Sequence, residues 1–97
     1  MVRGDLAAAL QSYRESLAIC ERLAKSDPGN AGWQRDLAVS YSKLASAFRK
    51  GGESAKVLDA LRQGRTIMER LTKLSPENAV WKRDLALFDG QIEELMR

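Results

Sequence analysis

The sequence contains no histidine and only one cysteine in 97 residues. Without histidine, the chain lacks the commonest general base near neutral pH and the commonest metal ligand. Cys20 has no second cysteine with which to form an internal disulfide, which fits a reducing compartment. Cys20 also lies on an apolar helical stripe, which favours a small hydrophobic packing role over a reactive thiol. The sequence therefore predicts a cytoplasmic protein with no disulfide and no metal site.

Long apolar runs and phosphate-binding loops are also missing. No apolar stretch approaches the ~20 residues that span a bilayer, and MVRGDLAAAL lacks the apolar core and cleavage site of a signal peptide. Gly51-Gly52 is not followed by the Lys-Ser/Thr pair of a phosphate-binding loop. Glu93 and Glu94 are adjacent, so on a helix they point in different directions. We expect a protein that is not an enzyme, needs no cofactor and does not enter a membrane.

Proline and glycine are scarce, with 2 and 7 residues respectively, and neither lies inside a long apolar stretch. This scarcity favours long helices over a fold of strands and turns. The hydrophobic share of 44% and the charged share of 30% are ordinary for a folded helical protein. The length suffices for one small domain, so residues 1–97 are expected to form a single domain.

An internal duplication is the strongest pattern that is present. Residues 4–49 and 52–97 align without a gap at a shift of 48 residues, and 18 of the 46 aligned positions are identical. Pro28 matches Pro76, and Trp33 matches Trp81. A period of about 20–50 residues is typical of a solenoid or another repeat array.

Apolar residues recur at steps of three and four along four segments, which is typical of amphipathic helices. The expected helices cover about residues 5–26, 31–50, 53–75 and 79–96. The connections between these segments are short, so neighbouring helices should run antiparallel.

Residues that begin and end helices fall between these segments. Asn30 and Asn78 each follow a turn that contains proline, and a short side-chain oxygen there can accept the free N–H groups of the next helical turn. Gly51-Gly52 follows the second segment, and glycine adopts the left-handed conformation at little cost. We therefore expect two asparagine N-caps and a glycine turn in the middle of the chain.

The second copy departs from the first at three places. Arg65 replaces Leu17, Gly64 lies in the middle of the third segment, and Asp89-Gly90 is expected to interrupt the fourth. These departures predict a degenerate copy or a terminal copy that caps the repeat.

Aromatic, leucine and alanine positions form a motif across the central turn. The motif consists of Tyr41, Leu44, Ala45, Phe48, the Gly51-Gly52 turn, Leu58, Leu61 and Pro76. Its second-helix part recurs in the earlier copy as Gly4, Asp5, Ala9, Leu10 and Tyr13. With these residues the chain resembles the tetratricopeptide-repeat (TPR) family. The usual TPR has about 34 residues, and about two additional turns in each helix give the 48-residue period while keeping the apolar stripe in phase.

The resemblance implies an all-α fold: four antiparallel helices forming two TPR-like helix hairpins, an α-solenoid fragment. It also implies a groove lined mainly by the first helix of each pair, here 31–50 and 79–96. The residues expected on this face are Arg35, Val39, Ser42, Ser46, Arg49 and Lys50, followed in the second copy by Arg83, Leu87, Gly90, Glu94 and Arg97.

This expected groove mixes small and charged side chains, so it suits an extended peptide or a partner helix. Arg49 and Lys50 favour an acidic partner near one end. Some TPR proteins hold a carboxyl terminus with a Lys/Asn clamp, but Ser42 and Ser46 occupy the positions where clamp residues are expected. The resemblance therefore does not imply a chaperone-tail site.

Two further features recur with the 48-residue period. Trp33 and Trp81 lie near helix starts, where packing against the preceding helix is favoured over a role as binding anchors, although tryptophan is enriched at binding hot spots. The dipeptide Arg-Asp follows each tryptophan two residues later, at 35–36 and 83–84. We expect these dipeptides to stabilise the repeat through ion pairs or caps across the neighbouring loop.

Once the excluded functions are set aside, these patterns favour a protein that binds a partner through its surface. We expect a protein–protein interaction module or scaffold that binds a peptide or partner helix through its groove and open repeat ends. A solenoid usually needs about three repeats and polar caps, so two uncapped repeats also predict self-association or a longer parent array. The alternative is a purely structural homodimeric bundle, in which the groove face is buried against a second copy.

Nucleic acid is a third candidate partner because the middle of the chain is basic. Residues 43–83 hold ten Lys and Arg against four Asp and Glu. However, Arg62 and Arg65 share a helix face with Glu69, and Phe48, the one aromatic residue in 43–80, belongs to the core stripe. The sequence therefore favours a protein partner over nucleic acid.

Overall fold

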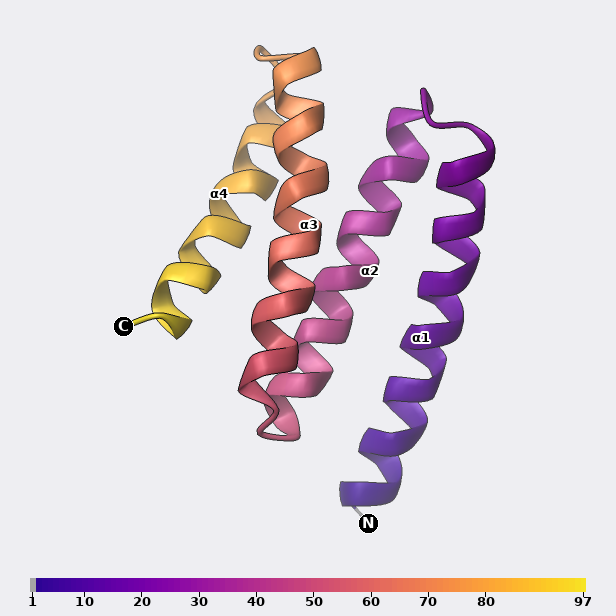
Figure 1. The fold of residues 1–97 in the computed structure, drawn as a ribbon, viewed down its shortest axis with the longest axis vertical. Coiled ribbons are helices and arrows are strands. Elements are labelled where there is room, and N and C mark those ends of the chain that lie inside the picture. Colours follow the sequence, from indigo (N-terminus) through magenta and orange to yellow (C-terminus); the bar gives the residue numbers. More distant parts are fainter. Residues whose placement is uncertain (1) are drawn as a thin grey trace.

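Four helices follow one another along the chain: α1 (Val2–Ser26), α2 (Ala31–Lys50), α3 (Ser54–Leu74) and α4 (Ala79–Leu95). In this computed structural model, which describes residues 2–97, each helix packs against the next and runs antiparallel to it (Figure 1). The expected all-α fold of four antiparallel helices is confirmed. The predicted helix bounds differ from the observed ones by one residue or none, except that α1 begins three residues earlier. Met1, the first residue of the expected domain, lies outside the described residues.

The helices form two faces around α2 and α3. On one face, α2 and α4 flank a cavity whose floor includes a side chain of α3. On the opposite face, α1 and α3 flank α2, which lies between them. The molecule is accordingly flat, with extents of 44 × 34 × 18 Å. Neither face is covered by another element of the described chain.

Asparagine side chains cap two of the helices, as expected. The backbone N–H groups of Trp33 and Trp81 donate hydrogen bonds to the Oδ1 atoms of Asn30 and Asn78, both at 3.0 Å. Each asparagine has extended backbone angles, which place its side chain over the first helical turn. Helices α2 and α4, which are equivalent in the two copies, therefore begin in the same way.

Replacing either cap with alanine should cost about 1 kcal/mol of unfolding free energy, because a backbone N–H at the helix start loses its acceptor. Asn30→Ala and Asn78→Ala should give similar losses in urea denaturation monitored by circular dichroism. Glu77→Ala is the matched control, because Glu77 is exposed and precedes the cap; it should change stability by less than about 0.5 kcal/mol. Equal values for control and cap variants would contradict the role of the caps.

The turn between α2 and α3 uses the expected glycine conformation at one of its two glycines. Gly52 has a φ of +73°, in the left-handed region that side chains disfavour, whereas Gly51 has a φ of −86°. The Glu53 N–H returns to the Phe48 carbonyl at 3.0 Å and closes the turn. This tight turn sets α3 antiparallel to α2.

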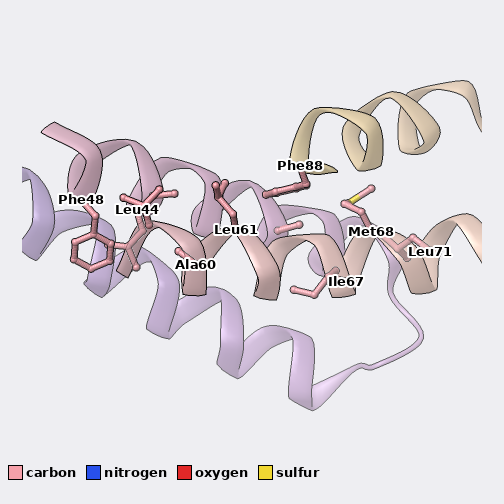
Figure 2. Close-up of a cluster of buried hydrophobic side chains, with 11 residues drawn as sticks. Leu44, Phe48, Ala60, Leu61, Ile67, Met68, Leu71 and Phe88 are labelled. Carbon is pink, nitrogen blue, oxygen red and sulfur yellow. The ribbon is translucent and has the colours of Figure 1, made fainter. Parts of the chain in front are cut away.

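Helix α3 carries the centre of the core. Leu61 and Met68 are fully buried, and Val57 is 1% exposed. Figure 2 shows the buried row from Ala60 to Leu71, with Phe88 above it. Side chains of α2 complete the cluster, so both hairpins share one core.

Helix α4 runs without interruption through Asp89 and Gly90, so the predicted break there is wrong. A glycine inside a helix costs only about 1 kcal/mol relative to alanine. Phe88 is buried, and Ile92 and Leu95 pack against the core. Apolar packing before and after the glycine is sufficient to keep the helix continuous.

Gly64 accommodates the ring of Phe88, which explains the glycine in the middle of α3. A Cβ atom at position 64 would lie 2.5 Å from both Cε1 and Cζ of Phe88. The counterparts of these two residues in the first copy are Ser16 and Ser40. Where the first copy has two small residues, the second copy thus has the smallest residue facing a large one, so the two differences form a matched pair.

Arg65 is a second matched change. Its counterpart is Leu17 and the counterpart of Asp89 is Tyr41; Leu17 and Tyr41 both line a cavity on the α1/α3 face. In the second copy Arg65 forms ion pairs with Asp89 and with Glu69, and these pairs raise the pKa of the guanidinium. An apolar contact between the helices of one hairpin is therefore replaced by a salt bridge in the other.

Candidate binding groove between helices α2 and α4

An ion pair joins the two groove helices. Arg35 Nε lies 2.8 Å from Asp84 Oδ2, and the side chains are 38% and 19% exposed. The two residues belong to the recurring Arg-Asp dipeptides, but they pair between repeats rather than across a loop, so that part of the expectation is wrong. A partly exposed pair contributes little stability, about 1 kcal/mol or less. The pair links α2 and α4 directly.

A cavity of about 110 Å³ opens beside this ion pair. Its floor is formed by Ala38, Met68 and Phe88, which are 1%, 0% and 5% exposed. An apolar cavity of about 150 Å³ accommodates benzene, so this one has room for a single aliphatic side chain. The remaining lining residues form the rim: Val39, Ser42, Asp84, Leu87 and Gln91.

Leu87 makes the rim of the cavity apolar. Its side chain is 55% exposed, although it borders a cavity with a buried apolar floor. Ser42 and Gln91 add hydrogen-bonding groups at the same rim. The site thus combines an apolar recess with a few polar groups, as is typical of sites that recognise a side chain.

Four residues expected in the groove gather at this cavity. Val39, Ser42 and Leu87 line it, and Arg35 lies at its edge through the pair with Asp84. These four come from two helices and were separated by up to 52 positions in the sequence (87 minus 35). The two copies thus contribute side chains to one cavity.

Ser46 and Lys50 lie at a different cavity, between α2 and the first half of α1. That cavity has a volume of about 360 Å³ and includes Asp5, Leu6 and Tyr13 among its lining residues. The residues expected on one face of α2 therefore border two separate cavities and do not form the floor of one continuous groove.

The other expected groove residues line neither cavity. Arg49 and Arg83 are exposed, as are Gly90, Glu94 and Arg97. Glu93 Oε1 on α4 and Arg97 Nη2, two residues beyond the end of that helix, are 3.5 Å apart in an exposed pair. These side chains are available to solvent, but the structure does not bring them to either recess.

Sequence reasoning missed five residues of the cavity: Ala38, Met68, Asp84, Phe88 and Gln91. Met68 and Phe88 lie on the apolar stripes of their helices and were expected in the core, whereas Ala38 and Gln91 carry no signal in the sequence. The Asp84 contact could have been found, because a 48-residue repeat brings equivalent dipeptides of successive groove helices next to each other. Helical periodicity alone cannot show that a core residue also forms the floor of a surface cavity.

The tryptophans differ in their surroundings. Both are half-buried, and Trp81 packs against the core cluster.

On the opposite face, Tyr41 donates a hydrogen bond to Glu21 at 3.5 Å. Burial and the nearby Glu21 carboxylate raise the pKa of the Tyr41 phenol, so the phenol is a neutral donor at physiological pH.

Asp84 is the carboxylate that lines the cavity among the described residues, and Arg35 pairs with it. Cys20 is half-buried on α1, where its Sγ lies 3.4 Å from Ser40 Oγ. Among the described residues, no three His, Cys, Asp or Glu side chains are grouped so as to hold a metal ion.

None of the helices in the described part of the chain is long and apolar enough to cross a bilayer.

The cavity between α2 and α4 thus consists of an apolar recess with two neutral polar groups at its rim and an ion pair beside it. Comparisons with family models, with curated proteins and with solved structures found no match to this chain.

Proposed function

We propose that this chain is a protein-interaction module of the TPR type, whose α2/α4 groove binds a segment of a partner protein. The observation that carries the proposal is the cavity of about 110 Å³ with a buried apolar floor and the exposed Leu87 at its rim. An apolar recess with a few polar groups at its rim is typical of a site that binds a side chain. The recurrence of the groove helices with a 48-residue period supports the TPR assignment.

The chemistry of the groove points to a partner segment with two features. An aliphatic side chain, such as leucine or valine, fits the cavity floored by Met68 and Phe88. An acidic residue suits Arg49 and Lys50 in the last turn of α2. From Val39 to Lys50 the helix rises about 16 Å. An extended peptide covers that distance in about five residues, so the acid should follow or precede the anchor by about that number.

A displayed library of random peptides tests the proposal. Selection on the immobilised wild-type chain should enrich peptides with an aliphatic anchor and an acidic residue about five positions away. Leu87→Asp should weaken binding of the enriched peptides at least tenfold, because a carboxylate at the rim opposes burial of the anchor. Fluorescence anisotropy with the synthesised peptides measures the change.

Ile19→Asp is the matched control, because Ile19 is 53% exposed, close to the 55% of Leu87, and lies on α1, away from the α2/α4 cavity. It should leave peptide affinity unchanged, and circular dichroism should show both variants folded. The proposal is wrong if no peptide is enriched, or if the two variants weaken binding equally. Burial of Leu87 in a symmetric dimer would favour the structural homodimeric bundle instead.

A further inference from the structure

At the centre of the helix stack α2 packs on α3, a contact that we call the central joint. The helices at the two ends, α1 and α4, correspond to the two sides of this joint, but each lacks the partner helix. By the 48-residue repeat, α1 is the counterpart of α3 and α4 is the counterpart of α2. Helices α2 and α3 pack on each other inside the chain, whereas α1 and α4 lie at opposite ends (Figure 1). We propose that copies of this chain join end to end, with α4 of one copy packing on α1 of the next as α2 packs on α3.

Helix α1 exposes the apolar residues that the joint buries on α3. Ile19 and Leu23 are 53% and 38% exposed. Their counterparts, Ile67 and Leu71, are only 5% and 4% exposed, and Ile67 borders a cavity together with residues of α2. The difference arises because α1 has no α2-like helix on that side. A second copy supplies one, in the form of its α4.

The same side of α1 is shaped for close packing. Ser12 is exposed on α1, and its counterpart Ala60 is 3% exposed on α3. A small residue at this position allows another helix to approach closely. The apolar pair Ile19 and Leu23 lies on this side toward the end of α1.

Helix α4 presents the complementary half of the joint. Met96 is 64% exposed, whereas its counterpart Phe48 is 7% exposed in the core. Ile92 is only partly buried, whereas its counterpart Leu44 is 7% exposed; Leu85 and its counterpart Leu37 are both partly buried. Apolar side chains thus recur at the counterparts of Leu37, Leu44 and Phe48, although Glu93 stands in place of the buried Ala45.

The charges at the two ends also match. Inside the chain, Arg35 of one groove helix pairs with Asp84 of the next. The remaining members of the two dipeptides are Asp36 and Arg83; both are exposed, and neither forms an ion pair among the described side chains. Repeating the internal geometry once more places Arg83 of one copy against Asp36 of the next.

Such a contact joins two different surfaces, so it leaves a new open end after each addition. The expected product is a series of oligomers that lengthens with concentration, not a closed dimer. The α2/α4 cavity lies inside one copy and remains available, so this inference does not depend on peptide binding.

Sedimentation velocity of the purified full chain over a range from about 1 μM to 1 mM tests the inference. The weight-average mass should rise continuously and pass twice the monomer mass. Ile19→Asp should weaken association at least tenfold, because it places a carboxylate in the apolar contact. Leu87→Asp is the control and should associate like the wild type, since the counterpart of Leu87 in the central joint, Val39, lines the groove.

A charge exchange separates the specific contact from general aggregation. Asp36→Arg alone and Arg83→Asp alone should each weaken association by roughly fivefold, the effect of about 1 kcal/mol for an exposed pair. The double variant should restore association, and so should a mixture of the two single variants. In both cases each contact again joins one acidic and one basic side chain. The signs are exchanged at every contact of the double variant and at alternate contacts of the mixture.

Three outcomes would overturn the inference: a mass that stays at the monomer value at 1 mM, a mass that stops at the dimer, or single variants that are not rescued by mixing. None of these outcomes depends on the peptide selection. Sedimentation can therefore contradict end-to-end joining while the groove proposal stands, and the peptide selection can contradict the groove proposal while joining stands.

Discussion

Phe88→Ala should lower the free energy of unfolding by about 3–5 kcal/mol, which is the usual cost of removing a buried phenylalanine ring. Phe88 is 5% exposed and is the buried residue that α4 contributes to the core. A domain of this size is stable by about 5–15 kcal/mol. The substitution therefore removes a large share of the total stability, and the loss should concentrate in α4.

Gly64→Ala should act in opposite directions with and without that ring. In the wild type the added methyl group overlaps Phe88, and overpacking of this kind costs about 1–3 kcal/mol. This cost of overpacking exceeds or cancels the gain of about 1 kcal/mol from replacing a glycine inside a helix. In the Phe88→Ala variant the overlap is gone, so the same substitution should stabilise the protein by about 1 kcal/mol.

A double-mutant cycle in urea measures this coupling directly. Gly90→Ala is the matched control, because Gly90 is also inside a helix but a Cβ there meets nothing within 4 Å. It should stabilise both backgrounds equally, by about 0.5–1 kcal/mol. If Gly64→Ala were to stabilise the wild type as much as Gly90→Ala does, the ring would not occupy the space above Gly64.

The helices and their ends could be predicted because each depends on residues close together in the sequence. Apolar spacing located all four helices, and the recurring Asn30 and Asn78 located two caps. The 48-residue period made each prediction twice, which is why the errors in the bounds were small. The groove position was partly predictable for the same reason, since Val39 and Leu87 are equivalent positions of the two copies.

The break expected at Asp89-Gly90 was wrong because the departures in the second copy were considered singly. Gly64 and Asp89 look unfavourable in isolated helices, but each faces a changed residue on the other helix of the hairpin. Comparing the copies in pairs would have shown that Ser16 and Ser40 become Gly64 and Phe88, a loss and a gain of volume. The helical pattern does not state which residues face each other, and that is the information the prediction lacked.

Leu61→Ala should destabilise the whole molecule by about 2–5 kcal/mol, the range for a fully buried leucine. Leu61 is 0% exposed on α3, and α3 packs against both α2 and α4. Unlike Phe88→Ala, whose effect should concentrate in α4, this substitution opens the core that both hairpins share. Hydrogen exchange should show protection falling in α2, α3 and α4 together.

Leu74→Ala is the control for Leu61→Ala, because it removes the same atoms from the same helix at a position that is 78% exposed. It should change stability by less than about 0.5 kcal/mol. The contrast tests how the two repeats are held together. If one core along α3 joins them, the Leu61 variant should lose both hairpins in one transition. If each hairpin were stable by itself, α4 would open while α1 and α2 kept their protection, and the shared core would not be what stabilises this fold.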